Sequence, residues 1–243
     1  MSTKSKWRGG NLAFYDNSTH ETVGPMAPLV YKEDFLGTTL IAGATEWLAK
    51  DIHAEATEAN VANAAEGVFR LHIGAGNAEQ EAGLTFNDKL FINLDKKPII
   101  EFVAAVHVLP TLDAELYFGV ANAYVKGRLA LADEGPTIHA AFMFDGSGAC
   151  TIHTDDTAVD NDAVATGVTV VADAKHVFRI DFTDITDVKF YIDGVGVATS
   201  TTFNMSTGTN VVVQPYAMIA KAAAAGTGLG DLDIDSIAVW SNR

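Results

Sequence analysis

The sequence has one cysteine, Cys150, among 243 residues. A single thiol excludes an intrachain disulfide and every zinc site that needs several cysteines. This usage is typical of a protein made in a reducing cytoplasm. The chain also lacks an apolar secretory core after its basic start, and no run reaches the ~20 apolar residues that span a bilayer. We therefore expect a soluble protein with no membrane partner.

Positive charge is scarce, with 16 bases against 31 acids and a formal net charge of −15. A surface so negative repels a phosphate backbone, so nucleic acid is excluded as a partner of the folded body. The bases are unevenly placed, because Lys4, Lys6 and Arg8 stand in the first eight residues and few acids precede Asp16. This asymmetry predicts an N-terminal tail with a partner of its own.

The first 34 residues show no sustained hydrophobic period, yet they carry several aromatics, in which disordered tails are poor. We interpret residues 1–34 as an extended arm that docks on a neighbouring chain, and a plain flexible terminus is the alternative. The residues expected to make this contact are Lys4, Lys6, Trp7, Arg8, Phe14, Tyr15 and Tyr31.

Beyond residue 34, short runs of β-branched and aromatic residues alternate with Gly, Asp, Asn and Thr clusters, which is typical of a sandwich or barrel. The clearest run covers residues 177–182, where Phe178, Ile180 and Phe182 alternate with charged residues. About a dozen such strands are too many for one open sheet, so they must stack or close. Residues 35–243 are therefore expected to form one all-β domain.

Two segments between the predicted strands leave alternatives open. Residues 54–66 are rich in Ala and Glu, and a short helix is the alternative to irregular structure there. Residues 154–163 are interpreted as an acidic loop. We expect these residues to form a solvated loop. A calcium site is the alternative, because calcium prefers several oxygen ligands. Its acids are Asp155, Asp156, Asp160 and Asp162, and no other cofactor is predicted.

The order of several segments carries a resemblance to a known family. These segments are residues 46–47, 67–71, 99–102, 176–182, 188–194 and 232–240, of which "FYIDG" and the terminal "IAVW" are the most specific. The chain resembles the concanavalin-A-like, laminin-G-like jelly-roll family. The resemblance implies an antiparallel jelly-roll β-sandwich of the lectin and glucanase type, carried behind the N-terminal arm.

Three other stretches, "WRGGNLAFYDNSTHETV" at 7–23, "YKEDFLG" at 31–37 and "AGLTFNDKL" at 82–90, are similar to structural proteins of tailed-bacteriophage virions. This resemblance implies a non-enzymatic capsid decoration or cementing protein. It would be made in the host cytoplasm and dock on the major capsid protein, or another virion protein, at the outer capsid surface. A homo-oligomer is expected, with a trimer as the first expectation. The alternative is a carbohydrate-binding module that attaches to a glycan on a host or other surface.

Asp231, Asp233 and Asp235 are the one constellation that could be catalytic, because alternate residues share one face of a strand. Retaining glycosidases use two carboxyls about 5–5.5 Å apart. The glucanases that the chain resembles have Glu at the outer positions, so a glycan hydrolase is a remote alternative. We expect these acids to form the polar face of a strand whose Leu232 and Ile234 face the core, and we assign no catalytic residue.

The remaining reactive or aromatic side chains are expected to be structural. Cys150 is interpreted as a buried small residue, and the seven histidines show no metal-binding spacing, although His139 and His153 would be neighbours if their strands pair. Trp47 and Trp240 are expected to pack in the core or at an edge. The aromatics considered for stacking on a sugar are Trp47, Trp240, Tyr117, Tyr124, Tyr191 and Tyr216.

Overall fold

The computed structural model describes residues 3–8, 11–16, 29–36, 47–52, 55–62, 64, 67–111, 114–125, 136–206, 211–223 and 229–242. Within these ranges the regular secondary structure consists of β-strands and one short 3-10 helix, η1 (Leu94–Lys96). No helix in these ranges is long and apolar enough to cross a membrane.

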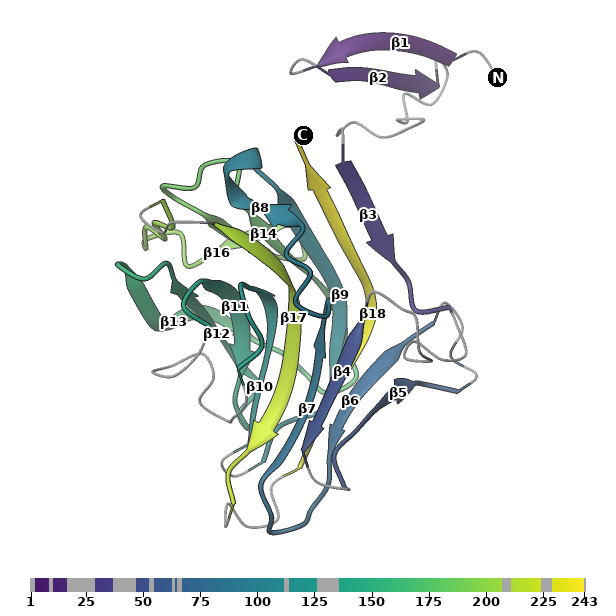
Figure 1. Ribbon diagram of the computed structural model, residues 1–243, viewed down its shortest axis with the longest axis vertical. Helices are drawn as coiled ribbons and strands as arrows, with labels where there is room; N and C mark the ends of the chain where they lie inside the picture. The colour runs from purple at the N-terminus through teal and green to yellow at the C-terminus, as the bar shows by residue number, and fades with distance from the viewer. Residues whose placement is uncertain are drawn as a thin grey trace.

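Two antiparallel sheets stack to form a sandwich (Figure 1). We call the first the front sheet. Its order is β13 (Asp160–Thr169), β12 (Ala149–Asp155), β11 (His139–Phe144), β10 (Glu115–Ala121), β17 (Val212–Lys221), β7 (Gln80–Thr85) and β4 (Leu48–Ile52), and β8 (Ile92–Asn93) also pairs with β17.

We call the second the back sheet. Its order is β16 (Val195–Val197), β15 (Lys189–Ile192), β14 (Lys175–Asp181), β9 (Ile99–Val108), β18 (Gly230–Ser241), β6 (Phe69–Ile73) and β5 (Thr57–Asn60), and β3 (Leu29–Glu33) also pairs with β18. Most neighbours in both sheets are distant in sequence, as a jelly roll requires. The predicted all-β jelly-roll sandwich is confirmed.

The core lies between the two sheets and is rich in phenylalanine. On β14, Phe178 and Ile180 are 2% and 0% exposed, as the alternation predicts. Phe118 of the front sheet packs its ring 4.9 Å from Phe178 and 5.4 Å from Phe102 of the back sheet, measured between centroids. Because the chain cannot form an internal disulfide, this apolar burial is the main force that holds the sheets together.

The described parts of the predicted N-terminal arm contain three strands. β1 (Thr3–Arg8) and β2 (Asn11–Asp16) form a hairpin that pairs with no other described strand, and Figure 1 draws it beyond the sandwich. β3 lies within the predicted arm but belongs to the back sheet, where Tyr31 pairs with Val239. The Tyr31 ring also packs on core aromatics, 5.4 Å from both Phe86 and Phe91. Tyr31 is thus part of the sandwich, whereas docking by the other arm residues stays a prediction.

The strand bounds bear on two local predictions. Within residues 54–66, where a short helix was the alternative, residues 57–60 form strand β5 and the described part contains no helix. The acidic loop predicted at 154–163 is a β-hairpin, because β12 extends to Asp155 and β13 begins at Asp160. The register of this pair shifts twice. The irregular pairing explains why the sequence of β13 lacks a clean alternation.

Candidate functional site

The predicted acids of β18, Asp231, Asp233 and Asp235, lie on the outer face of the back sheet. Leu232 and Ile234, which alternate with them, are fully buried and face the core. Asp233 accepts hydrogen bonds from Arg70 on β6, at 2.6 Å from Nε and 2.7 Å from Nη2. The hydrogen bond with Asp233 raises the pKa of Arg70. The expectation that these acids form the polar face of the strand is confirmed.

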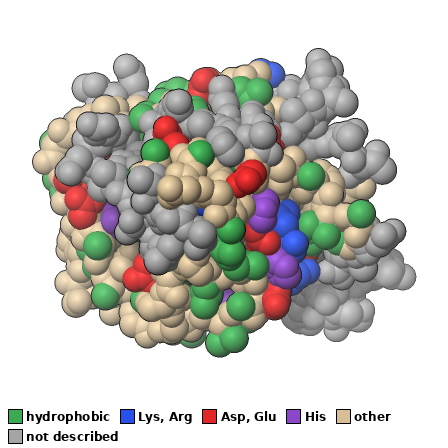
Figure 2. Space-filling model, turned by 90° about the horizontal axis from the view of Figure 1, so that it is seen from below, with side chains coloured by type: hydrophobic (Ala, Val, Ile, Leu, Met, Phe, Trp, Pro, Cys, Tyr) green, Lys and Arg blue, Asp and Glu red, His purple; other side chains and the backbone are tan. Residues whose placement is uncertain are grey.

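The other two acids are also held by bases, from the adjacent strand β6 and from β14, which lies beyond β9. Asp231 contacts Nδ1 of His72 at 2.5 Å, and Asp235 accepts a hydrogen bond from Nζ of Lys175 at 2.7 Å. Figure 2 shows histidine, basic and acidic side chains gathered in one patch of the surface seen from below. A carboxylate bound to a base in this way is poorly suited to act as a nucleophile or proton donor. The geometry therefore favours a structural network over a catalytic pair.

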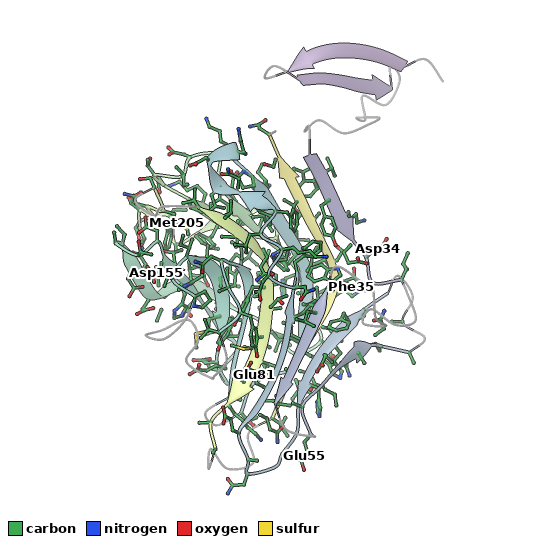
Figure 3. The ribbon with its side chains drawn as sticks, viewed as in Figure 1. Asp34, Phe35, Glu55, Glu81, Asp155 and Met205 are labelled. Carbon is green, nitrogen blue, oxygen red and sulfur yellow. The ribbon has the colours of Figure 1, made fainter. Side chains whose placement is uncertain are left out.

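An open pocket of about 610 Å³ adjoins this network at one end of the back sheet. His72 belongs to both, because it lines the pocket and contacts Asp231. Figure 3 places Glu55, which also lines the pocket, at the lower end of the molecule. The full lining consists of Glu55, Thr57, His72, Gly74, Ala75 and Gly76.

The rim of the pocket is held in place by two buried polar side chains. Nζ of Lys221 donates hydrogen bonds to the carbonyl oxygens of Gly74 at 2.5 Å and Gly76 at 2.6 Å. Gln80 accepts a hydrogen bond from the Gly74 amide at 2.7 Å and donates one to Glu55 at 3.0 Å. Lys221 and Gln80 are both 0% exposed. These contacts fix the rim and the Glu55 carboxylate before any ligand binds.

The four acids predicted as a calcium loop lie elsewhere, and Figure 3 shows Asp155 on the side of the molecule away from Glu55. Asp155 accepts a hydrogen bond from the Thr157 amide at 2.7 Å, and Asp156 accepts one from Val159 at 2.8 Å. These carboxylates thus stabilise the β12–β13 turn. Across the described ranges, no group of three or more Asp, Glu, His or Cys side chains could hold a metal ion. Calcium binding stays a prediction.

His139 and His153 lie on adjacent strands β11 and β12, as predicted, although they are not directly opposite. His139 donates from Nδ1 to the carbonyl of Pro136 at 2.8 Å, and its Nε2 has no hydrogen-bond partner among the described residues. Burial lowers the pKa of both histidines below the ordinary value of 6.5. On the same front sheet, burial raises the pKa of the Cys150 thiol to about 12, so it is poorly suited as a nucleophile.

The structure separates the candidate sugar-stacking aromatics. Trp47 is 4% exposed, in the core as predicted, and Tyr117 and Tyr216 are each 1% exposed on the outer face of the front sheet. Tyr191 and Trp240 are partly exposed. Tyr124 is also partly exposed, but its ring packs 6.3 Å from that of Tyr216.

Sequence reasoning found the acids of β18 but missed the bases that hold them and the pocket beside them. Arg70 and Asp233 are 163 positions apart, and the pairing of β6 with β18 brings them together. One signal was present, because Arg70 and His72 alternate with the apolar Phe69, Leu71 and Ile73. That alternation predicts an outward-facing pair of bases, although not their partners.

No protein-family model matches the sequence, and no curated protein matches it either. Solved structures do share its fold. The carbohydrate recognition domain of Emp47p matches with a TM-score of 0.56 and 12% identity over 88% of this chain and 96% of that chain. A beta-1,3-glucanase from Mycobacterium marinum has a TM-score of 0.51 and 15% identity, over 89% and 99% of the two chains.

The alginate lyase AlgAT5, of polysaccharide lyase family 7, has a TM-score of 0.52 and 10% identity, over 79% of this chain and 84% of that one. Identities this low establish the fold alone. This chain is therefore an antiparallel jelly-roll β-sandwich of the concanavalin-A-like type.

Proposed function

We propose that this chain is a carbohydrate-binding module and that a sugar binds in the pocket beside His72. The observation that carries the proposal is the pocket itself, which is open and bounded by a rim that Lys221 fixes. The fold supports the proposal, because proteins of the same fold include a carbohydrate recognition domain and two enzymes named for glycans.

The pocket offers the groups that sugar hydroxyls need. A hydroxyl both donates and accepts hydrogen bonds, so a sugar site combines acceptors with donors. Glu55 supplies a carboxylate acceptor, and the Thr57 hydroxyl can donate or accept. Asp231 engages Nδ1 of His72, which leaves Nε2 for a ligand. A few polar groups fixed in this way can orient a small polar ligand.

A glycan array followed by isothermal titration calorimetry tests the proposal. His72→Ala should weaken binding of the selected glycan at least tenfold, because it removes a ring nitrogen from the pocket. His107→Ala is the matched control, since His107 forms a similar pair with Asp173 outside the pocket. Equal affinities of the two variants, or no binding of the wild-type chain to any glycan, would reject the proposal.

We also propose, as a second role, that the N-terminal hairpin attaches the sandwich to a phage capsid. The observation that favours it is that β1 and β2 pair with neither sheet and carry Lys4, Lys6 and Arg8 at alternate positions in a chain of net charge −15. An attached hairpin would leave the pocket open, so the two roles are compatible. A trimer stays the expected oligomer.

Co-sedimentation with undecorated phage heads tests this second role. The full chain should sediment with the heads, whereas a chain that begins at Leu29, and so keeps β3, should not. Binding by the truncated chain would show that the hairpin is not the anchor. If neither form sediments, the capsid role is rejected.

A further inference from the structure

We propose that the outer face of the back sheet holds a second sugar subsite, a stacking platform formed by the Tyr191 ring. The proposal rests on the proposed carbohydrate-binding function and extends it, because two separate subsites on one face select a long glycan chain over a single terminal sugar. It is carried by the contacts of Tyr191 on its two neighbouring strands.

The Tyr191 ring points outward and is held in place from one side. Its neighbours in sequence, Phe190 and Ile192, are 1% and 4% exposed, so the strand alternation turns Tyr191 away from the core. Arg179, its register partner on β14, places Cζ 4.0 Å from the ring centroid. A guanidinium at that distance attracts the ring and restricts its rotation. Nε of Arg179 has no hydrogen-bond partner among the described residues. The position of the guanidinium is therefore fixed by its stacking on the Tyr191 ring.

The opposite side of the ring faces a position without a side chain. Gly196 on β16 is the register partner of Tyr191 there, and it is exposed. A Cβ at Gly196 would lie 3.7 Å from Cε1 of Tyr191, in ordinary van der Waals contact. Glycine therefore places no side chain of its own against this side of the ring, and the nearest side-chain atom to the same Cβ position is Cγ2 of Thr199, at 3.4 Å. A partly exposed aromatic ring with a hydroxyl at its tip can stack on the C–H face of a sugar and hydrogen-bond to its hydroxyls.

The distance between the platform and the pocket sets the length of the ligand. Four strand-to-strand steps lead from β6, which carries His72, to β15, which carries Tyr191. The two subsites are also displaced along the strand direction by about seven residues. On β9, Val108 is the register partner of Asp231 near the pocket, and Glu101 is the register partner of Arg179 near the platform. With strands about 4.8 Å apart and a rise of about 3.3 Å per residue, the two subsites lie roughly 30 Å apart. A polysaccharide can fill both subsites, whereas a disaccharide can fill one.

Three variants test the platform by affinity electrophoresis in gels that contain soluble β-1,3-glucan, alginate or any polysaccharide that the array identifies. Tyr191→Ala should weaken polysaccharide binding about tenfold, because avidity from the second subsite is lost. Gly196→Val should weaken it similarly by covering the ring, and Tyr191→Phe should retain most of it. Binding of the matching disaccharide should stay unchanged in all three variants.

The outcomes distinguish the platform from the pocket. If Tyr191→Ala and Gly196→Val bind polysaccharide like the wild type while His72→Ala does not, the platform is wrong and the carbohydrate-binding function stands. If Tyr191→Ala also loses the disaccharide, the residue acts on the pocket or the fold, and the platform is again wrong. If the wild-type chain binds none of the polysaccharides, the proposed function and the platform fail together.

Discussion

Arg70 on β6 binds both carboxylate oxygens of Asp233 on β18, through Nε at 2.6 Å and Nη2 at 2.7 Å. The side chains are 28% and 18% exposed, so the pair is only partly screened by water. A bidentate, charge-assisted contact of this kind is stronger than an ordinary surface ion pair. It joins two strands that have no covalent link near this point.

Asp233→Asn should therefore lower the free energy of unfolding by about 1–2 kcal/mol, since it removes the charge that Arg70 faces. Urea denaturation measures the change. Asp95→Asn, at an exposed position in η1, is the control and should change stability by less than about 0.5 kcal/mol. If the two variants are equally stable, the Arg70–Asp233 pair does not stabilise the sandwich.

The alternation of the strands made much of the fold predictable. Phe178, Ile180 and Phe182 are buried as their period of two indicates. A period of two assigns a residue to a face but does not state which strand lies beside it. The pairing of β14 with β9 is set by contacts between residues at least 70 positions apart, such as Phe178 with Phe102.

Strand β13 and the candidate site show why the rest could not be predicted. β13 contains Asp160 and Asp162 and has Ala163 in the left-handed region, at a φ of 51°, so its sequence and its backbone both depart from a regular strand. The pocket depends on Lys221, which belongs to β17 but reaches the carbonyls of Gly74 and Gly76 after β6. No local sequence pattern indicates that a lysine will bind backbone carbonyls some 145 positions away.

Lys221→Met should loosen the rim of the pocket, because it removes both hydrogen bonds to the carbonyls of Gly74 and Gly76. Hydrogen exchange measured by mass spectrometry should show faster exchange in the peptide that covers residues 74–76. Glycan affinity should fall as the rim loses its order. Lys189→Met is the control, since Lys189 pairs with Asp187 away from the pocket. Unchanged exchange in Lys221→Met would mean that other contacts fix the rim.

Substitution by alanine should change the free energy of unfolding differently at Gly119, on a buried strand, and at Gly196, on an exposed strand. A Cβ at Gly119 on β10 would lie 2.1 Å from the carbonyl oxygen of Ala140 on β11, which is far too close. Gly119→Ala should therefore force the strands apart and lower the free energy of unfolding by about 2–3 kcal/mol. Gly196→Ala meets only contacts of 3.4 Å or more and should change it by less than about 0.5 kcal/mol. Thermal unfolding compares the two, and similar losses would contradict the close approach of β10 to β11.

Burial of His139 should make the stability of the sandwich depend on pH. Burial lowers its pKa below the ordinary 6.5, and the same cause acts on His153, although Asp162 opposes the shift in both. The unfolded chain therefore takes up protons below about pH 6.5 that the folded chain does not. Stability is full above that pH and falls as the pH drops from 6.5 toward the folded pKa, by up to about 1.4 kcal/mol per pH unit for each histidine.

His139→Gln removes one of these two titrations, so its free energy of unfolding should fall less between pH 7 and pH 5.5 than that of the wild type. Urea denaturation at several pH values measures this slope. Tyr117→Phe, a buried change on the same face of the front sheet, controls for general destabilisation and should keep the wild-type slope. Parallel slopes for His139→Gln and the wild type would mean that His139 is protonated equally in the folded and unfolded chains.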